Sequence, residues 1–321
     1  MEKRSMSKNW MAAIRFPNLV MVIVAMLAAN YFILLSGFHT HKVYGELPWY
    51  ILIPLILATV FIAAGGNLYN DLMDEDIDSV NHKNRSKFRG LFKKDLEIAY
   101  LVFSLLGLFF GGLASFLVHK VNMGLIFILC LGLLRFYSNS LKRKMFWGNF
   151  VVSVLTALPI LLIWVFDFLY LSHNRGDLFV EAGVALSLNF RLIVVYAIFA
   201  FLASMLREVV KDMEDIEGDA KCGARTLPIV KGIHFCRIYF VGFWLLLVGW
   251  VFLAYELLSS YNLWINIMIF GLGTLLTAAF AIPYIFKADN KKEYHRLSTF
   301  LKIFMGIGLL SMLLTPLNGL F

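Results

Sequence analysis

Two acidic clusters hold the residues whose types and spacing point to chemistry. The first runs from Asn70 to Asp78, directly after an apolar run from Pro48 to Leu68. Acidic residues at a membrane boundary are costly, so they indicate function. On a helix Asn70, Asp71, Asp74 and Asp78 share one face. Carboxylates that repel one another need a cation between them, and Mg²⁺, which takes carboxylate, phosphate and water oxygens, is the simplest one.

The second cluster, Asp212 to Asp219, again follows an apolar run, Leu192 to Leu206. Asp212, Asp215 and Asp219 have the same spacing as the aspartates of the first cluster, three residues and then four. Gly218 is expected to loosen the helix just before Asp219. Two such clusters facing each other predict a site for two metal ions and a diphosphate.

The composition indicates that these clusters belong to an integral membrane protein. Of the 321 residues, 60% are hydrophobic and only 16% are charged, and the mean hydropathy is +0.76. Soluble domains have roughly 25% charged residues. Because a span needs about 20 apolar residues, we predict an all-α bundle of nine transmembrane helices around a central cavity. The expected spans are 17–37, 48–69, 97–118, 122–140, 149–171, 190–211, 236–257, 262–286 and 298–318.

The basic residues predict the orientation of this bundle. All but four of the 29 Lys and Arg residues fall on the side of the N-terminus, and the exceptions are Lys42, Lys120, Arg175 and Arg191. The positive-inside rule therefore puts the N-terminus and both acidic clusters on the cytoplasmic side. We expect a multi-pass protein of the cytoplasmic (inner) membrane. The net charge of +8 is a topology signal, so no nucleic-acid partner is expected.

The chain is predicted to be one membrane domain, residues 1–321, without a linker. Expected helices one to four and five to eight are interpreted as distant repeats, because each set places an acidic cluster after its second helix, and the ninth helix is extra. The three cysteines have neither metal-ligand spacing nor a disulfide pattern.

Basic residues beside the clusters are candidates for neutralising phosphate charge. Solvated positive-inside loops would explain them equally well. The candidates for binding the diphosphate are Lys83, Arg85, Lys142, Lys211 and Arg225. Arg207 and Lys211 are also expected to pair locally with Glu208 or Asp215. Arg15 either anchors the first helix at the membrane surface or reaches into a polar cavity.

These motifs together resemble the UbiA superfamily of intramembrane prenyltransferases. The resemblance rests on Asn70-Asp71-x-x-Asp74-x-x-x-Asp78 and Asp215-x-x-x-Asp219 on nine expected helices, with a further signature around Tyr137-Ser138, Leu141-Lys142-Arg143 and Gly148-Asn149. The stretch from Arg207 to Asp219, followed by Thr226-Leu227-Pro228-Ile229, looks like the digeranylgeranylglyceryl phosphate synthase branch. The chain departs from a common proline-containing segment, because it reads Asn81-His82-Lys83-Asn84-Arg85-Ser86.

The resemblance implies Mg²⁺-dependent transfer of a prenyl group, expected to come from geranylgeranyl diphosphate, to geranylgeranylglyceryl phosphate. Asp74, Asp78, Asp215 and Asp219 would be catalytic. The ligands of two Mg²⁺ ions would be Asn70, Asp71, Asp74, Asp78, Asp212, Asp215 and Asp219. Arg15, Asn18 and Tyr137 are further candidates for binding substrate. The expected partners are the prenyl diphosphate, the lipophilic acceptor and the bilayer, with no obligate protein partner.

Two alternatives stay open at this point. The acceptor could be aromatic, such as 4-hydroxybenzoate, dihydroxynaphthoate, homogentisate or haem. The chain could instead be a membrane transporter that uses the aspartates as a cation path. Transporter sites tend to lie near the middle of the bilayer, whereas both clusters here lie at expected cytoplasmic helix ends beside basic loops, which favours a phosphate-bearing substrate.

Overall fold

The computed structural model describes residues 9–34, 47–73 and 93–318. Its internal contacts divide the chain into two compact units. The first unit comprises residues 1–23, 48–148 and 217–225, and the second comprises 24–47, 149–216 and 226–321. The prediction of a single membrane domain built from two repeats stays a prediction.

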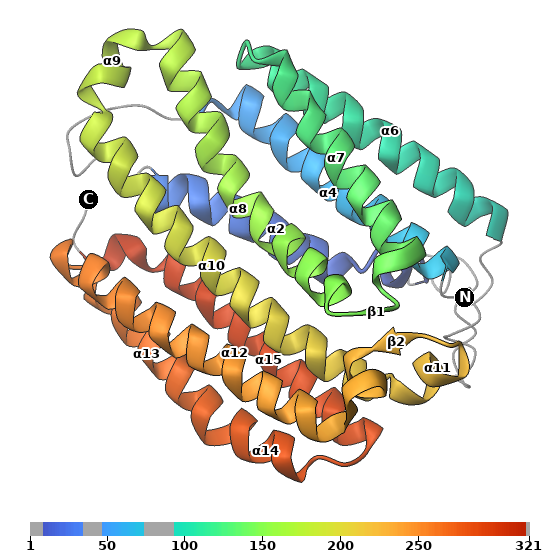
Figure 1. The fold of residues 1–321 in the computed structure, drawn as a ribbon. Coiled ribbons are helices and arrows are strands. Elements are labelled where there is room, and N and C mark those ends of the chain that lie inside the picture. The colour runs from blue at the N-terminus through green and yellow to red at the C-terminus, as the bar shows by residue number, and fades with distance from the viewer. Residues whose placement is uncertain (1–8, 35–46, 74–92, 319–321) are drawn as a thin grey trace, which may run out of the picture. The chain divides into compact units, whose positions relative to one another are not determined.

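The first unit is built on a hairpin of two long helices, α4 and α6 (Figure 1). Its elements are the first part of α2 (Phe16–Ala28), α4 (Trp49–Met73), α6 (Lys93–Leu117), the 3₁₀ turn η2 (Val121–Met123), α7 (Gly124–Phe136), the π-helical turn η3 (Tyr137–Leu141), β1 (Lys144–Met145) and most of α11 (Ile216–Lys221). Gly107 of α6 lies so close to Ile62 of α4 that a Cβ there would be 3.1 Å from the Ile62 nitrogen. Small residues of this kind let membrane helices approach closely.

A short N-terminal helical segment packs against the end of this hairpin. Trp10, Ala13 and Ile14 contact a buried cluster of leucines from α4 and α6 that includes Leu68 and Leu96. The side-chain amide of Asn67 also donates a hydrogen bond to the Ile14 carbonyl, at 3.0 Å. The segment before α2 is therefore fixed next to the last turns of α4, where the first acidic cluster begins.

The second unit is organised around α10 (Gly183–Glu214), which packs against α12 (Leu227–Ser260) and α15 (Lys291–Leu313) (Figure 1). Its remaining elements are η1 (Ala29–Leu34), most of α8 (Trp147–Asn174), α9 (Gly176–Glu181), α13 (Trp264–Leu276), η4 (Thr277–Ala281), α14 (Ile282–Lys287) and η5 (Thr315–Asn318). The strand β2 (Arg225–Thr226) begins in the first unit, where Arg225 pairs with β1.

A buried polar cluster joins three helices of this second unit. The Asn266 amide donates to the Tyr196 hydroxyl at 2.7 Å and to the Ser311 carbonyl at 2.8 Å. Tyr196 and Ser311 also share a hydrogen bond of 3.1 Å between their hydroxyls. Buried polar groups are costly unless hydrogen-bonded, and these satisfied contacts fix α10, α13 and α15 against one another.

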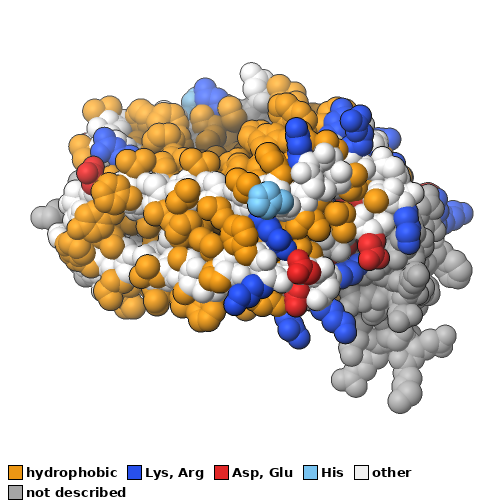
Figure 2. Space-filling view, turned by 60° about the horizontal axis from the view of Figure 1, so that its bottom comes forward, with side chains coloured by type: hydrophobic (Ala, Val, Ile, Leu, Met, Phe, Trp, Pro, Cys, Tyr) orange, Lys and Arg blue, Asp and Glu red, His pale blue; other side chains and the backbone are white. Residues whose placement is uncertain are grey.

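The prediction of an all-α, multi-pass membrane protein is confirmed. Within the described residues, nine helices are long and apolar enough to cross a membrane. Hydrophobic side chains cover much of the face shown in Figure 2. Many large apolar side chains are largely exposed on these helices, among them Phe109, Leu129 and Phe252. Exposed apolar surface of this extent fits a lipid environment.

The predicted spans agree with these helices apart from three N-terminal boundaries. The sixth, seventh and ninth helices begin at Gly183, Leu227 and Lys291, several residues before the predicted starts. The ninth begins early because the Asn290 side chain accepts a hydrogen bond from the Glu293 backbone N–H, at 3.1 Å, which caps its first turn. The charged stretch between the predicted eighth and ninth spans is therefore helical from Lys291 onward.

Candidate functional site

The first acidic cluster begins inside the last turn of α4. Asn70 is buried, and the Asp71 side chain is 16% exposed. The guanidinium of Arg15 donates to the Asp71 carboxylate, with 3.2 Å between Nη2 and Oδ1. Asp74 and Asp78, together with Lys83 and Arg85, lie outside the described residues.

Arg15 is brought to Asp71 by a break in the N-terminal segment. Its backbone has φ of 53°, in the left-handed region that is uncommon for a residue with a side chain. This residue separates the short helical segment that contains Trp10 from α2, and its carbonyl accepts from the Asn18 N–H at 2.8 Å. Arg15 therefore contacts the acidic cluster, and the two roles expected for it, as a surface anchor or as a residue of a polar cavity, stay predictions.

The loop after α7 holds two other sequence candidates in the first unit. Tyr137 begins the π-helical turn η3, and Lys142 follows its end. Gly148 approaches this turn so closely that a Cβ would be 3.0 Å from the Leu141 carbonyl oxygen. The Arg225 N–H donates to the Arg143 carbonyl at 2.9 Å. Backbone contacts thus fix the basic loop that follows α7.

The second acidic cluster does not lie on one continuous helix. The helix α10 ends at Glu214, Asp215 has φ of −101° and ψ of 8°, and α11 starts at Ile216. The break therefore falls at Asp215, whereas the sequence predicted it at Gly218, which lies inside α11. Asp219 is buried and belongs to the first unit, while Asp212 and Asp215 belong to the second.

Two polar contacts in the second unit orient the acidic side chains of the second cluster. The Asn149 amide, from α8, donates to the Asp212 carboxylate at 2.9 Å. The Lys291 ammonium, at the start of α15, lies 3.7 Å from Oδ1 of Asp215. The neutral Asn149 amide and the Lys291 ammonium thus each approach a carboxylate oxygen of a type that Mg²⁺ also accepts as a ligand.

A neighbouring contact strengthens the attachment of α15 to the end of α10. The His295 ring nitrogen Nδ1 lies 2.9 Å from the Glu214 carboxylate. One turn deeper in α10, Glu208 is buried and takes both local cations. Arg207 donates to Oε1 at 2.9 Å and Lys211 to Oε2 at 3.3 Å. Of the two local partners expected, Glu208 is thus the one found for both.

The oxygen atoms of these side chains suit a hard divalent cation. Carboxylate and amide oxygens are the protein ligands that Mg²⁺ accepts, usually one or two at a time with waters and phosphates. Among the described residues, no group of three His, Cys, Asp or Glu side chains is close enough to hold a metal by itself. The donor types fit Mg²⁺, and a substrate phosphate would have to supply part of its coordination.

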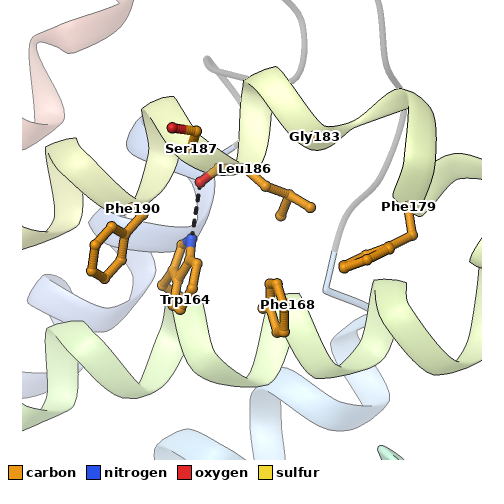
Figure 3. A pocket seen from close by; sticks show the side chains of 7 residues that line it. All are labelled: Trp164, Phe168, Phe179, Gly183, Leu186, Ser187 and Phe190. Atoms are coloured by element: carbon orange, nitrogen blue, oxygen red, sulfur yellow. Dashed lines mark hydrogen bonds between the residues drawn. The ribbon is translucent and has the colours of Figure 1, made fainter.

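An apolar cavity of about 260 Å³ lies in the second unit, at the end of α8 opposite Asn149 (Figure 3). Trp164 and Phe168 of α8 line it together with Phe190 of α10, whose ring centroid lies 4.7 Å from that of Trp164, and the Trp164 indole N–H donates to the Leu186 carbonyl at 3.3 Å. Of the residues that the structure describes, those that line the cavity include no charged side chain. Its lining suits a hydrocarbon chain and no polar chemistry.

Sequence reasoning identified most of the acidic residues but missed their partners. Asn149 was expected only as part of a signature, and Lys291 and His295 were not expected at all. One sequence signal could have identified Lys291. Asn290 is a favourable N-cap residue with Glu293 three positions later, which predicts that a helix starts at Lys291.

Comparisons with known proteins agree with this arrangement. The model of the UbiA prenyltransferase family matches residues 32–307. The digeranylgeranylglyceryl phosphate synthase of Methanosphaera stadtmanae is 33% identical over 260 residues, which cover 78% of this chain and 83% of that protein. The protein of the same name from Thermococcus sibiricus is 36% identical, and there the chain spans 56% of the relative's length.

A solved structure shows the same fold. It comes from a study of digeranylgeranylglyceryl phosphate synthase in membranes, is 24% identical in sequence, and covers 98% of both chains with a TM-score of 0.58.

Proposed function

Because the chain belongs to the UbiA prenyltransferase family, we propose that it transfers a geranylgeranyl group from geranylgeranyl diphosphate to a hydroxyl group of geranylgeranylglyceryl phosphate. The observation that carries this choice of acceptor is the similarity to digeranylgeranylglyceryl phosphate synthases, which reaches 33% identity over more than three quarters of the chain. The stretch from Arg207 to Asp219 supports the same branch.

The donor diphosphate is proposed to bind through Mg²⁺ at the acidic clusters. The proposed ligands are Asn70, Asp71, Asp74, Asp78, Asp212, Asp215 and Asp219, and two ions are expected. When bound, Mg²⁺ neutralises the diphosphate and makes it a better leaving group. The residues fit this role, because Asp71 and Asp215 already attract cationic side chains, at 3.2 Å and 3.7 Å.

The protein's own side chains would complete the reaction site. Lys83, Arg85, Lys142, Lys211 and Arg225 are proposed to stabilise negative charge on the departing diphosphate. The apolar surroundings of the spans would exclude water, which otherwise captures an allylic cation. The acceptor oxygen then bonds to C1 of the prenyl group as the bond between C1 and the diphosphate breaks, and the departing diphosphate takes up the hydroxyl proton.

The protein is an integral, multi-pass membrane protein. We propose that its N-terminus and both acidic clusters face the cytoplasm, because nearly all basic residues lie on that side in sequence. No protein partner is required for the proposed reaction.

An acceptor competition tests this function directly. Purified protein, Mg²⁺ and radiolabelled geranylgeranyl diphosphate would be incubated with geranylgeranylglyceryl phosphate or with a mixture of aromatic acids. We expect label in the glycerophosphate product, and its loss when a chelator is added. Label in an aromatic product alone would refute the proposed acceptor while leaving prenyl transfer intact.

A further inference from the structure

A group of cations in the second unit lies deeper in the spans than the second acidic cluster. The buried carboxylate of Glu208 holds Arg207 and Lys211. The Nε atom of Arg207 is buried and finds no hydrogen-bond partner in the part of the chain that the structure describes. A third cation, Lys302 of α15, lies within electrostatic reach of Arg207. Two helices thus bring Arg207 and Lys302 together.

The register of α10 against α15 supports this placement. Three contacts between the two helices fix this register. Tyr196 shares a hydrogen bond with Ser311, and the Phe199 ring lies 5.2 Å from the Phe304 ring, measured between centroids. Asp215 forms an ion pair with Lys291. The helices are antiparallel, and His295 of α15 lies 2.9 Å from Glu214 of α10, so the residues two turns further along on the same faces, Arg207 and Lys302, lie at the same level. Arg207 lies between Phe199 and Asp215, and Lys302 lies between Phe304 and Lys291.

Both cations lie within segments long enough to span a membrane. At a rise of 1.5 Å per residue, Lys302 is about 16 Å from the start of α15, and Arg207 is about 10 Å from the end of α10. Ionisable side chains inside a span are costly, so they indicate a functional site with a polar ligand. Two neighbouring cations also repel each other, which favours an anion between them.

A phosphate group matches the chemistry of this pair. A guanidinium presents several N–H donors in a fixed fork, and an ammonium adds a compact positive charge, which together suit a phosphate dianion. The carboxylates of the acidic cluster bind phosphate only through a metal, whereas Arg207 and Lys302 can contact it directly. These cations are therefore suited to a second phosphate, separate from the metal-bound diphosphate.

We propose that Arg207 and Lys302 bind the phosphate group of the acceptor lipid. The proposal rests on the proposed function, in which the acceptor carries a phosphate of its own. It makes the pair a determinant of acceptor specificity, because an acceptor without a phosphate gains nothing from the two cations. The donor diphosphate offers the same chemistry, so the test must distinguish the two sources.

The test compares binding of two acceptors to the variant Lys302→Met in detergent without Mg²⁺. The acceptors are radiolabelled geranylgeranylglyceryl phosphate and the corresponding alcohol, geranylgeranylglycerol. We expect Lys302→Met to bind the phosphate roughly ten- to a hundredfold more weakly, the effect of losing a hydrogen bond to a charged group. Binding of the alcohol should change less than about twofold, which also shows that the variant is folded.

Two further arms complete the test. The matched control is Lys292→Met, because Lys292 is an exposed lysine near the start of the same helix, and it should bind both acceptors as the wild type does. Donor binding is measured with geranylgeranyl diphosphate and Mg²⁺, and Lys302→Met should leave it unchanged.

Three results would overturn the inference. In the first, Lys302→Met binds geranylgeranylglyceryl phosphate as tightly as the wild type does. In the second, its affinity for the alcohol falls as much as its affinity for the phosphate. In the third, only its affinity for the donor falls, which would mean that the cations hold the donor diphosphate. Each of these leaves the proposed function standing if the wild type still transfers label to geranylgeranylglyceryl phosphate. Failure of that transfer in the wild type would refute the function separately.

Discussion

Close packing between α10 and α15 gives a sharp prediction about stability, because Gly308 lies directly against the Phe199 ring. A Cβ at position 308 would be 2.9 Å from Cδ1 and 3.2 Å from Cζ of Phe199. The ring cannot swing away easily, because it is 4% exposed and lies 5.0 Å from the Phe270 ring and 5.2 Å from the Phe304 ring, measured between centroids. Gly308→Ala must therefore separate the two helices or displace the ring.

Gly306 provides a matched control two residues away. A Cβ at Gly306 would meet nothing within 4 Å. Both Gly→Ala changes gain the same helix propensity, up to about 1 kcal/mol, so this term cancels in their comparison. Overpacking of a core typically costs about 1–3 kcal/mol. We therefore expect Gly308→Ala to be less stable than Gly306→Ala by about 1–3 kcal/mol.

The assay is denaturant unfolding in detergent micelles, followed by circular dichroism for the two variants and the wild type. The difference in free energy of unfolding between the two alanine variants is the quantity to compare. If Gly308→Ala were as stable as Gly306→Ala, the close contact between α10 and α15 would be wrong, and so would the register that brings Lys302 to Arg207.

Two further predictions concern the partners of the second acidic cluster. Asn149→Ala removes the hydrogen bond to Asp212, so the Mg²⁺ concentration that gives half-maximal activity should rise about ten- to a hundredfold, as for other groups that orient metal ligands. An unchanged Mg²⁺ dependence would show that Asp212 needs no such orientation. Lys291→Met removes a cation that competes with Mg²⁺ for Asp215. Because such partly exposed ion pairs contribute about 0–1 kcal/mol, the Mg²⁺ concentration that gives half-maximal activity should fall by up to about fivefold. A rise in the Mg²⁺ requirement would instead mean that Lys291 assists metal binding. Both variants can be measured in one Mg²⁺ titration of prenyl transfer.

Much of the fold was predictable because membrane helices leave a strong signal in sequence. Long apolar runs gave the nine spans nearly at their observed bounds. The boundaries that were missed have local causes. At α15 the cap at Asn290 extends the helix into charged sequence, and at α12 five helical residues precede a kink at Gly232, which has φ of 83°.

The partners of the acidic residues were harder to predict for a different reason. Spacing along a helix predicts which side chains share a face, but not which distant residue faces them. Arg15 contacts Asp71 across 56 residues because a left-handed backbone conformation turns the chain there. Asn149 contacts Asp212 across 63 residues through the pairing of α8 with α10. Helix propensity also placed the helix break wrongly. Gly218 is the weaker helix former, yet it lies inside α11, and the break falls at Asp215.

The central claim is that the carboxylates of the acidic clusters bind the metal–diphosphate group of the donor. Release of diphosphate from geranylgeranyl diphosphate in the presence of Mg²⁺ and geranylgeranylglyceryl phosphate measures this step. We expect Asp215→Asn to lower the rate at least about a hundredfold, the scale of losing a group that stabilises the transition state. The control Asp177→Asn, which changes an exposed aspartate in α9, should keep the wild-type rate. Wild-type rates in Asp215→Asn would contradict the account.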